Sequence, residues 1–148
     1  MKKPGSIFEY EEERNDDLMR CYEAQRRQNC KRKSHVIYAA TVAMPSKRFW
    51  VSEERAALVV SSLMRGDKLE KMGRMKKEMY LEIYRRVLEA RKDSPGESIY
   101  NLTFDVVNSP APKFYLTPGS AKVIINYIKR GWYRERRWYI ERRRRLRH

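Results

Sequence analysis

The sequence runs Pro45-Ser-Lys-Arg-Phe-Trp-Val-Ser-Glu-Glu-Arg-Ala-Ala-Leu-Val-Val-Ser-Ser-Leu-Met-Arg-Gly66 and, 65 residues later, Pro110-Ala-Pro-Lys-Phe-Tyr-Leu-Thr-Pro-Gly-Ser-Ala-Lys-Val-Ile-Ile-Asn-Tyr-Ile-Lys-Arg-Gly131. The two stretches align without a gap, and five positions are identical, including the first proline and the last glycine. Apolar residues and turn residues also match between them, which is the pattern of a duplicated unit. We therefore predict an internal repeat in this chain.

Each copy of this stretch carries the signals of a capped helix. Ser52 and Thr117 are placed as N-caps, whose hydroxyl oxygens accept a hydrogen bond from an N–H group of the first turn. Apolar side chains then recur at i, i+3, i+4 and i+7, which gives the helix one buried face. Gly66 and Gly131 stand where a helix ends in a left-handed residue. The pattern predicts a helix of about four turns in each copy.

Two further helices are expected before the capped helix in each copy. Ser94-Pro-Gly-Glu97 is a capping-box pattern that predicts a short helix to about Val107, and its counterpart starts near Ser34 and ends near Ala43. A longer amphipathic helix precedes each short one. In the first copy it follows Ser6-Ile-Phe-Glu9, which is again a capping-box pattern.

The prediction is an all-α fold with two tandem three-helix, helix-turn-helix-like units related by the repeat, followed by a basic C-terminal helix or tail. The segments 49–51 and 114–116 are expected to be extended linkers rather than strands. Because about 65 residues is small for independent folding, we expect the two units to pack together. The expected boundaries are 1–66 for the first unit, 67–78 for a basic connector, 79–131 for the second unit and 132–148 for an Arg- and aromatic-rich tail.

Positive charge is concentrated at the C-terminal end of the chain. The 148 residues carry a net charge of +15, and residues 129–148 contain ten Lys and Arg against two Glu, which is more than half of the excess. Nearly all of these cations are Arg, and Trp132, Tyr133, Trp138 and Tyr139 stand among them. Arginine binds phosphate through its planar fork and stacks on bases. The tail therefore predicts a nucleic-acid partner, with DNA favoured over RNA.

The last helix of the second unit is the expected groove-reading element. A helix-turn-helix places this helix in the major groove, where Asn recognises adenine and Lys or Arg recognises guanine or phosphate. The equivalent helix of the first unit begins with Glu53 and Glu54, which repel phosphate, so the first unit is expected to contact protein or to brace the core. The predicted nucleic-acid-binding residues are Lys113, Ser120, Lys122, Asn126, Lys129, Arg130, Arg134, Arg136, Arg137, Arg142, Arg143, Arg144, Arg145 and Arg147.

A second function stays open at this point, that of a non-enzymatic assembly or adaptor protein of a virion or ribonucleoprotein, whose tail docks on an acidic partner or RNA. The tail rings would stack on unpaired bases. The acidic segments Glu11-Glu12-Glu13 and Asp16-Asp17 are expected to form a solvated face, the alternative being that they bind a basic tail, from the same chain or a neighbour. A contact with another copy or a protein partner is left open at this helix or at the first unit.

Catalysis finds little support in the sequence. The only histidines are His35 and His148, and the two cysteines lack the spacing of a metal site. Phosphate-binding glycine loops and hydrolase or metalloprotease motifs are missing. We therefore expect no enzyme activity, no catalytic residue, no metal and no cofactor. With no apolar run of about 20 residues and an acidic N-terminal segment, the chain is expected in the cytoplasm and away from membranes.

Two phrases resemble known sequences. Met44-Pro-Ser-Lys-Arg-Phe-Trp-Val-Ser-Glu-Glu-Arg-Ala56 and Ser109-Pro-Ala-Pro-Lys-Phe-Tyr-Leu-Thr-Pro-Gly-Ser-Ala121 are similar to phrases in uncharacterised small basic proteins of bacterial mobile elements and phages. The resemblance implies the bacterial cytoplasm or nucleoid, or a phage-encoded protein. It implies no activity and identifies no functional residue.

Overall fold

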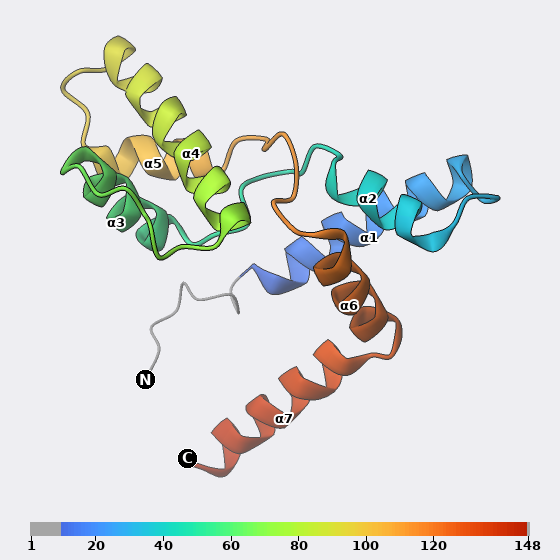
Figure 1. The fold of residues 1–148 in the computed structure, drawn as a ribbon. Coiled ribbons are helices and arrows are strands. Elements are labelled where there is room, and N and C mark those ends of the chain that lie inside the picture. Colours follow the sequence, from blue (N-terminus) through green and yellow to red (C-terminus); the bar gives the residue numbers. More distant parts are fainter. Residues whose placement is uncertain (1–9, 148) are drawn as a thin grey trace.

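The computed structural model describes residues 10–147, and all regular structure in this range is helical (Figure 1). The all-α prediction is therefore confirmed. The only β pairing among these residues is an antiparallel bridge between Ser46 and Ala111. The helices are α1 (Glu11–Gln28), α2 (Ser34–Val42), α3 (Glu53–Met64), α4 (Arg74–Asp93), α5 (Ile99–Val107), α6 (Pro118–Lys129) and α7 (Trp132–Leu146).

The first six helices pack in two groups of three, which we call lobe A (α3, α4 and α5) and lobe B (α1, α2 and α6) (Figure 1). The chain crosses from lobe B to lobe A between α2 and α3, and returns between α5 and α6. Each lobe thus contains two helices from one half of the sequence and the third helix from the other half. The tandem grouping expected from the sequence, 1–66 and 79–131, is not how the helices pack.

The two crossing segments, residues 43–52 and 108–117, run side by side. Ser46 and Ala111 exchange both backbone hydrogen bonds, each with an N···O distance of 3.0 Å. The N–H groups of Phe49 and Phe114 each donate, also over 3.0 Å, to the carbonyl oxygen of the last residue of α5 and α2 respectively. Every one of these groups has its counterpart 65 residues away, at the spacing of the sequence alignment. The crossing is therefore locally symmetric, and neither segment forms a strand.

Each crossing segment anchors its phenylalanine in the lobe that it enters. Phe49 is 1% exposed in the core of lobe A, beside Ile83 and Val107. Phe114 is buried in lobe B with Leu18 and Ile125. Burying a side chain of this kind stabilises a fold by about 1.5–3 kcal/mol. The arrangement in which each lobe takes one helix from the other half of the sequence is thus held by apolar contacts at both ends of the crossing.

Local signals of the repeat stretch are found where they were expected. The Oγ of Ser52 accepts a hydrogen bond from the backbone N–H of Arg55, and Oγ1 of Thr117 accepts one from Ser120, both over 3.1 Å. Gly66 and Gly131 have φ values of +96° and +73°, in the region that favours glycine. The predicted caps and helix ends are confirmed.

Other expected boundaries shift. Ser98, not Ser94, caps α5, because its hydroxyl accepts from the N–H of Asn101, so that helix begins four residues later than the capping-box pattern predicts. Helix α4 begins at Arg74, so residues 74–78 of the expected connector are helical. The expected capping box at residues 6–9 lies outside the described range.

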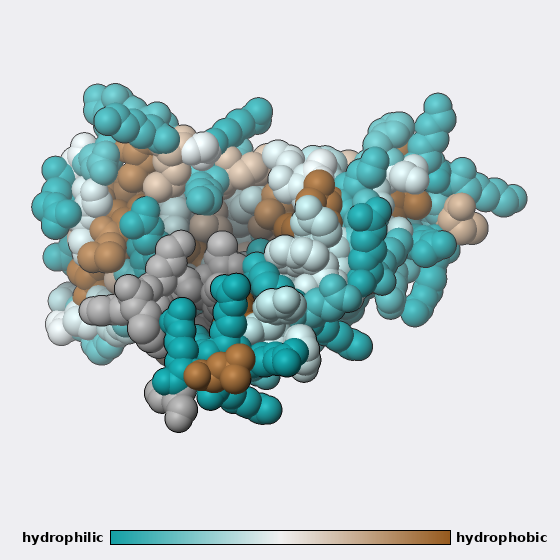
Figure 2. Space-filling view, turned by 90° about the horizontal axis from the view of Figure 1, so that it is seen from below, coloured by the Kyte–Doolittle hydropathy of each residue, from teal (hydrophilic) through white to brown (hydrophobic). Residues whose placement is uncertain are grey.

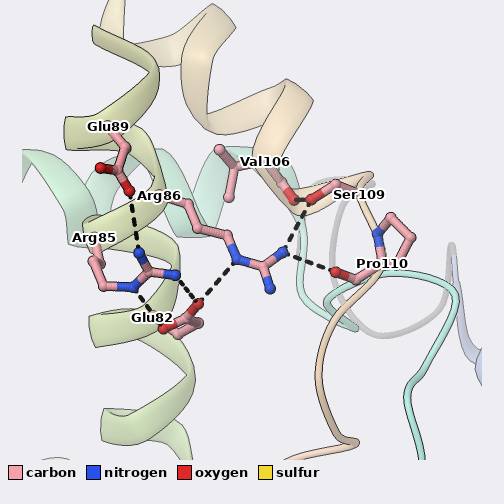
Figure 3. Close-up of polar contacts among 7 residues, drawn as sticks. All are labelled: Glu82, Arg85, Arg86, Glu89, Val106, Ser109 and Pro110. Atoms are coloured by element: carbon pink, nitrogen blue, oxygen red, sulfur yellow. Dashed lines mark hydrogen bonds and ion pairs between the residues drawn. The ribbon is translucent and has the colours of Figure 1, made fainter. Parts of the chain in front are cut away.

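One arginine of α4 contacts both crossing segments, and Figure 3 shows its hydrogen bonds to the second of them. Arg86 of α4 donates from Nε to Glu82 over 3.0 Å and from Nη1 to the carbonyl oxygen of Pro110 over 2.8 Å. Its guanidinium carbon also lies 5.0 Å from the ring centroid of Phe49, a cation–π contact. Arg86 therefore contacts the second crossing segment through a hydrogen bond and the first through its aromatic ring.

Candidate nucleic-acid interface

The Arg-rich tail is a helix. Helix α7 begins directly after Gly131, whose positive φ ends α6 and turns the chain, and it runs outward from lobe B (Figure 1). Of the two states that the sequence left open for the tail, a helix or a flexible segment, the structure has the helix. Its ionic side chains are consequently displayed around a rigid rod about 22 Å long.

The first turn of α7 is fixed by aromatic contacts. The ring of Trp132 stacks on that of Tyr127 in α6, with centroids 4.9 Å apart. Tyr133 is buried beside it, and burial raises the pKa of its hydroxyl. The guanidinium of Arg136 covers Trp132 at 4.8 Å from the ring centroid. This cluster sets the direction in which the rest of α7 projects.

The middle of α7 is bound by the acidic start of α1. Arg136 forms an ion pair with Glu11, and Arg137 forms one with Glu12. Glu11 is only 3% exposed, so its carboxylate is shielded from water, whereas the Arg136 side chain is partly exposed. The expectation that the acidic segment is a solvated face is wrong at Glu11 and at Asp17, which is also buried. The alternative expectation, contact with a basic tail, is confirmed for the chain's own tail.

Beyond this contact α7 is exposed to solvent. From Trp138 to Arg147, every side chain except the half-buried Ile140 is exposed. Figure 2, which views the molecule from below, shows hydrophilic side chains spreading around this part of the surface. We define the distal arginines as Arg142, Arg143, Arg144, Arg145 and Arg147.

The distal arginines are the densest positive charge of the described structure. They fill five of six consecutive positions and, among residues 10–147, none of them is in an ion pair. Successive helical residues are about 100° apart, so these side chains point in nearly all directions around the axis. Arg142 also lies 5.1 Å from the ring centroid of Trp138, which presents an arginine and an indole together. Arg134, near the start of the helix, is likewise exposed.

The predicted residues of α6 lie on a different flank from the start of α7. Lys129 donates to the hydroxyl of Tyr22 in α1 over 3.1 Å. Burial acts to raise the pKa of Tyr22, but the hydrogen bond and charge of Lys129 outweigh it and lower that pKa. Lys122 is exposed and Asn126 half-buried. Lys122 lies about 140° around the helix from Tyr127, where α7 is attached.

The remaining predicted residues have separate positions. Lys113 lies on the second crossing segment, where Nζ pairs with Glu78 of α4 over 2.9 Å. Ser120 stands in the first turn of α6, and its hydroxyl bonds to that of Thr117. Arg130 is exposed at the C-terminal end of α6. The structure therefore brings the α7 arginines together and leaves Lys113 and Ser120 apart from them.

Sequence reasoning missed two residues that position α7. Tyr127 stacks on Trp132, and Arg14 of α1 lies close enough to Tyr133 for its charge to act on the pKa of that hydroxyl. Tyr127 has a signal in the sequence, because an aromatic residue one helical turn before the helix-ending Gly131 can meet the aromatic pair Trp132 and Tyr133 that follows that glycine. Arg14 has none, since it is more than a hundred residues from its partner.

Within the described range, no three His, Cys, Asp or Glu side chains converge as metal ligands do. None of the helices found between residues 10 and 147 combines the length and apolarity needed to cross a bilayer. No protein-family model, curated protein or solved structure matches the chain.

Proposed function

We propose that this protein binds double-stranded DNA, in a regulatory or architectural role, through the distal half of α7 with the exposed flank of α6 beside it. The observation that carries the proposal is the set of distal arginines, exposed and without ion pairs in the described structure. Such a cluster attracts a polyanion and releases its condensed counterions on binding.

The dimensions of α7 suit the major groove. An α-helix with side chains is about 10–12 Å wide, and the major groove of B-DNA is about 12 Å wide. The exposed part from Trp138 to Arg147 is about 15 Å long, since each helical residue rises 1.5 Å. At about 3.4 Å per base pair, this part spans four to five base pairs. Arginines pointing in all directions then reach phosphates on both walls of the groove.

A polyanion also relieves a strain within α7 itself. Like charges four residues apart destabilise a helix by about 0.2–0.5 kcal/mol per pair, and Arg143 and Arg147 are such a pair. The C-terminal dipole of the helix offsets part of that repulsion. Phosphates that bind between the arginines remove the rest, so DNA binding and helix formation favour each other.

The duplicated architecture is part of the same proposal. We take the two halves of the chain as copies of one three-helix, helix-turn-helix-like unit whose third helices have been exchanged. The equal lengths of α2 and α5, and of α3 and α6, support this, as do the paired hydrogen bonds of the crossing. In this arrangement α6 belongs to lobe B, where α1 supplies an acidic neighbour rather than a second basic helix.

Exposed rings favour single-stranded nucleic acid, RNA included, as the second candidate. Trp138 and Tyr139 are 56% and 61% exposed, and exposed rings stack on unpaired bases. A duplex offers such rings no base faces except at its ends. Relative affinity for duplex and single-stranded probes therefore separates the two candidates.

The test is fluorescence anisotropy with a labelled duplex of about 20 base pairs, measured between about 50 and 200 mM salt. One variant replaces all five distal arginines with glutamine. The matched control replaces Arg26, Arg27, Lys31, Arg32 and Lys33, which are also exposed and clustered but lie at the α1–α2 end of lobe B. Both variants lose the same positive charge, so a difference between their duplex affinities reports where the charge lies rather than how much of it there is.

We expect the α7 variant to lose at least 100-fold in duplex affinity at low salt, because up to five phosphate contacts are removed. The control is expected to lose less than tenfold. Equal losses in the two variants would show that only net charge matters, and the proposal would then be wrong. Tighter binding to a single-stranded probe or to polyglutamate than to the duplex would favour the second candidate or an acidic protein partner instead.

A further inference from the structure

A cavity of about 430 Å³ lies where the two crossing segments meet α1, α3 and α4. This volume falls in the range of small-molecule sites, about 300–1,000 Å³. Both crossing segments contribute equivalent residues to its lining: Trp50 with Val51 from the first, and Tyr115 with Leu116 from the second. The cavity therefore sits at the centre of the exchanged fold and is separate from the distal half of α7.

Aromatic rings dominate its walls. Tyr10, Trp50, Tyr80, Phe114 and Tyr115 all line the cavity. Flat rings from several directions suit a flat, conjugated ligand, which gains stacking energy against them. An aliphatic ligand would bury the same area without using this geometry.

The charged groups of the lining are all cationic. Arg14, Arg55 and Lys76 contribute to the walls, and no carboxylate of the described residues does. Three positive charges beside an aromatic cavity favour a ligand that carries negative charge at its edge. Lys76 is exposed in the first turn of α4, so a charged group at the mouth of the cavity would meet it without deep burial.

Two further features mark this place as unusual in the molecule. The buried Nε1 of Trp50 has no hydrogen-bond partner among the described residues, although buried donors normally have one. Tyr115 has a φ of +57°, and only one other non-glycine residue between 10 and 147, Leu69, has a positive value. Such backbone conformations cost about 1–3 kcal/mol and cluster at ligand sites.

We propose that this cavity binds a nucleobase that carries a phosphate, with the base between the aromatic rings and the phosphate near Arg55 and Lys76. A free nucleoside monophosphate and the 5′-phosphorylated end of a DNA strand share this chemistry. The inference is independent of duplex binding by α7, because none of the lining residues belongs to that helix.

The test follows the Trp50 indole N–H resonance in the full chain by NMR, assigned with Trp50→Phe, while AMP is added. The variant that lacks the five distal arginines is titrated in parallel, so that AMP binding at α7 is excluded. A saturable shift of the Trp50 indole N–H resonance is expected in both proteins, and the Trp138 resonance is expected not to shift. Adenosine and inorganic phosphate, which each lack half of the proposed ligand, are expected to bind at least tenfold more weakly.

Lys76→Gln tests the assigned phosphate contact, and Lys77→Gln, on the neighbouring residue outside the lining, is its matched control. We expect tenfold weaker AMP binding for the first and unchanged binding for the second. A trinucleotide with a 5′-phosphate identifies the source: tighter binding than AMP indicates a strand end, and weaker binding a free nucleotide. No saturable shift of Trp50 with either probe, or an equal effect of both substitutions, would overturn the proposal whatever the result with duplex DNA.

Discussion

The crossing can be tested with one engineered disulfide. Ser46 and Ala111 exchange both backbone hydrogen bonds, and opposite residues of this type have Cα atoms about 5.5 Å apart. This separation matches the usual distance across a disulfide. We therefore expect Ser46→Cys with Ala111→Cys to form a bond spontaneously in air. Cys30, which is exposed, is replaced by serine, whereas Cys21 is fully buried and stays.

The stabilisation follows from the length of the closed loop. A bond between positions 65 residues apart lowers the entropy of the unfolded chain by an amount equivalent to about 4 kcal/mol. Loss of the hydrogen bond from Ser46 Oγ to the carbonyl oxygen of Arg48 costs about 1 kcal/mol of this gain. We predict that the oxidised protein is more stable than the reduced one by about 2–4 kcal/mol.

The assay is urea unfolding of the oxidised and reduced forms, together with thiol titration to show that the bond has formed. The register control pairs Lys47→Cys with Ala111→Cys, because neighbouring residues of an extended segment point to opposite sides. It is expected to form the bond poorly. Failure of the 46–111 pair to oxidise, or a lower stability after oxidation, would refute the side-by-side crossing.

Three further predictions follow from the contacts described above. Glu11→Gln with Glu12→Gln releases Arg136 and Arg137 of α7 from their ion pairs. The affinity for duplex DNA, measured by anisotropy, is then expected to rise severalfold at low salt and to depend more steeply on salt. An unchanged affinity would mean that these two arginines do not reach DNA. Ser52→Ala and Thr117→Ala each remove a helix cap and should lower the free energy of unfolding by about 1 kcal/mol in urea titrations, and a loss at only one of the two sites would contradict their equivalence. Burial raises the pKa of Tyr115 to about 12 from its usual value near 10.0, so the stability contributed by the neutral hydroxyl is present below pH 10 and is lost as the pH rises towards 12. Tyr115→Phe should therefore flatten the fall in the free energy of unfolding between pH 10 and 12. An unchanged dependence of stability on pH would contradict the burial effect.

Helix positions were predictable because their signals are local. The hydroxyls of Ser52 and Thr117 need only the next three residues to act as caps, and Gly66 and Gly131 need only their own backbone freedom. The start of α5 was misplaced because Ser94 and Ser98 both precede it and both can cap. Only the final packing decides between two such neighbouring serines.

The exchange of helices was not predictable from the same signals. The buried faces of α3 and α6 are nearly alike, with Ala56 and Val60 in one and Ala121 and Ile125 in the other. Either face can pack on either pair of partner helices, so the apolar pattern does not choose between them. The choice depends on the crossing segments and their mutual hydrogen bonds, which are contacts between residues far apart in sequence.

The candidate site was partly predictable. The charge of α7 is a property of composition, and its arginines were identified from the sequence. The ion pair of Arg136 with Glu11 joins residues 125 positions apart and was only one of two readings of the acidic segment. The aromatic cavity was missed altogether, because its walls come from three helices and both crossing segments, and none of these carries a recognisable motif.

The most direct measurement of duplex binding by α7 is the slope of log K against log salt concentration for the duplex. Each phosphate neutralised contributes about −0.9 to that slope for B-DNA. If the distal arginines make these contacts, the slope of the wild-type protein will be steeper by about 4.5 than that of the variant lacking all five. Equal slopes for the two proteins would contradict an interface on α7.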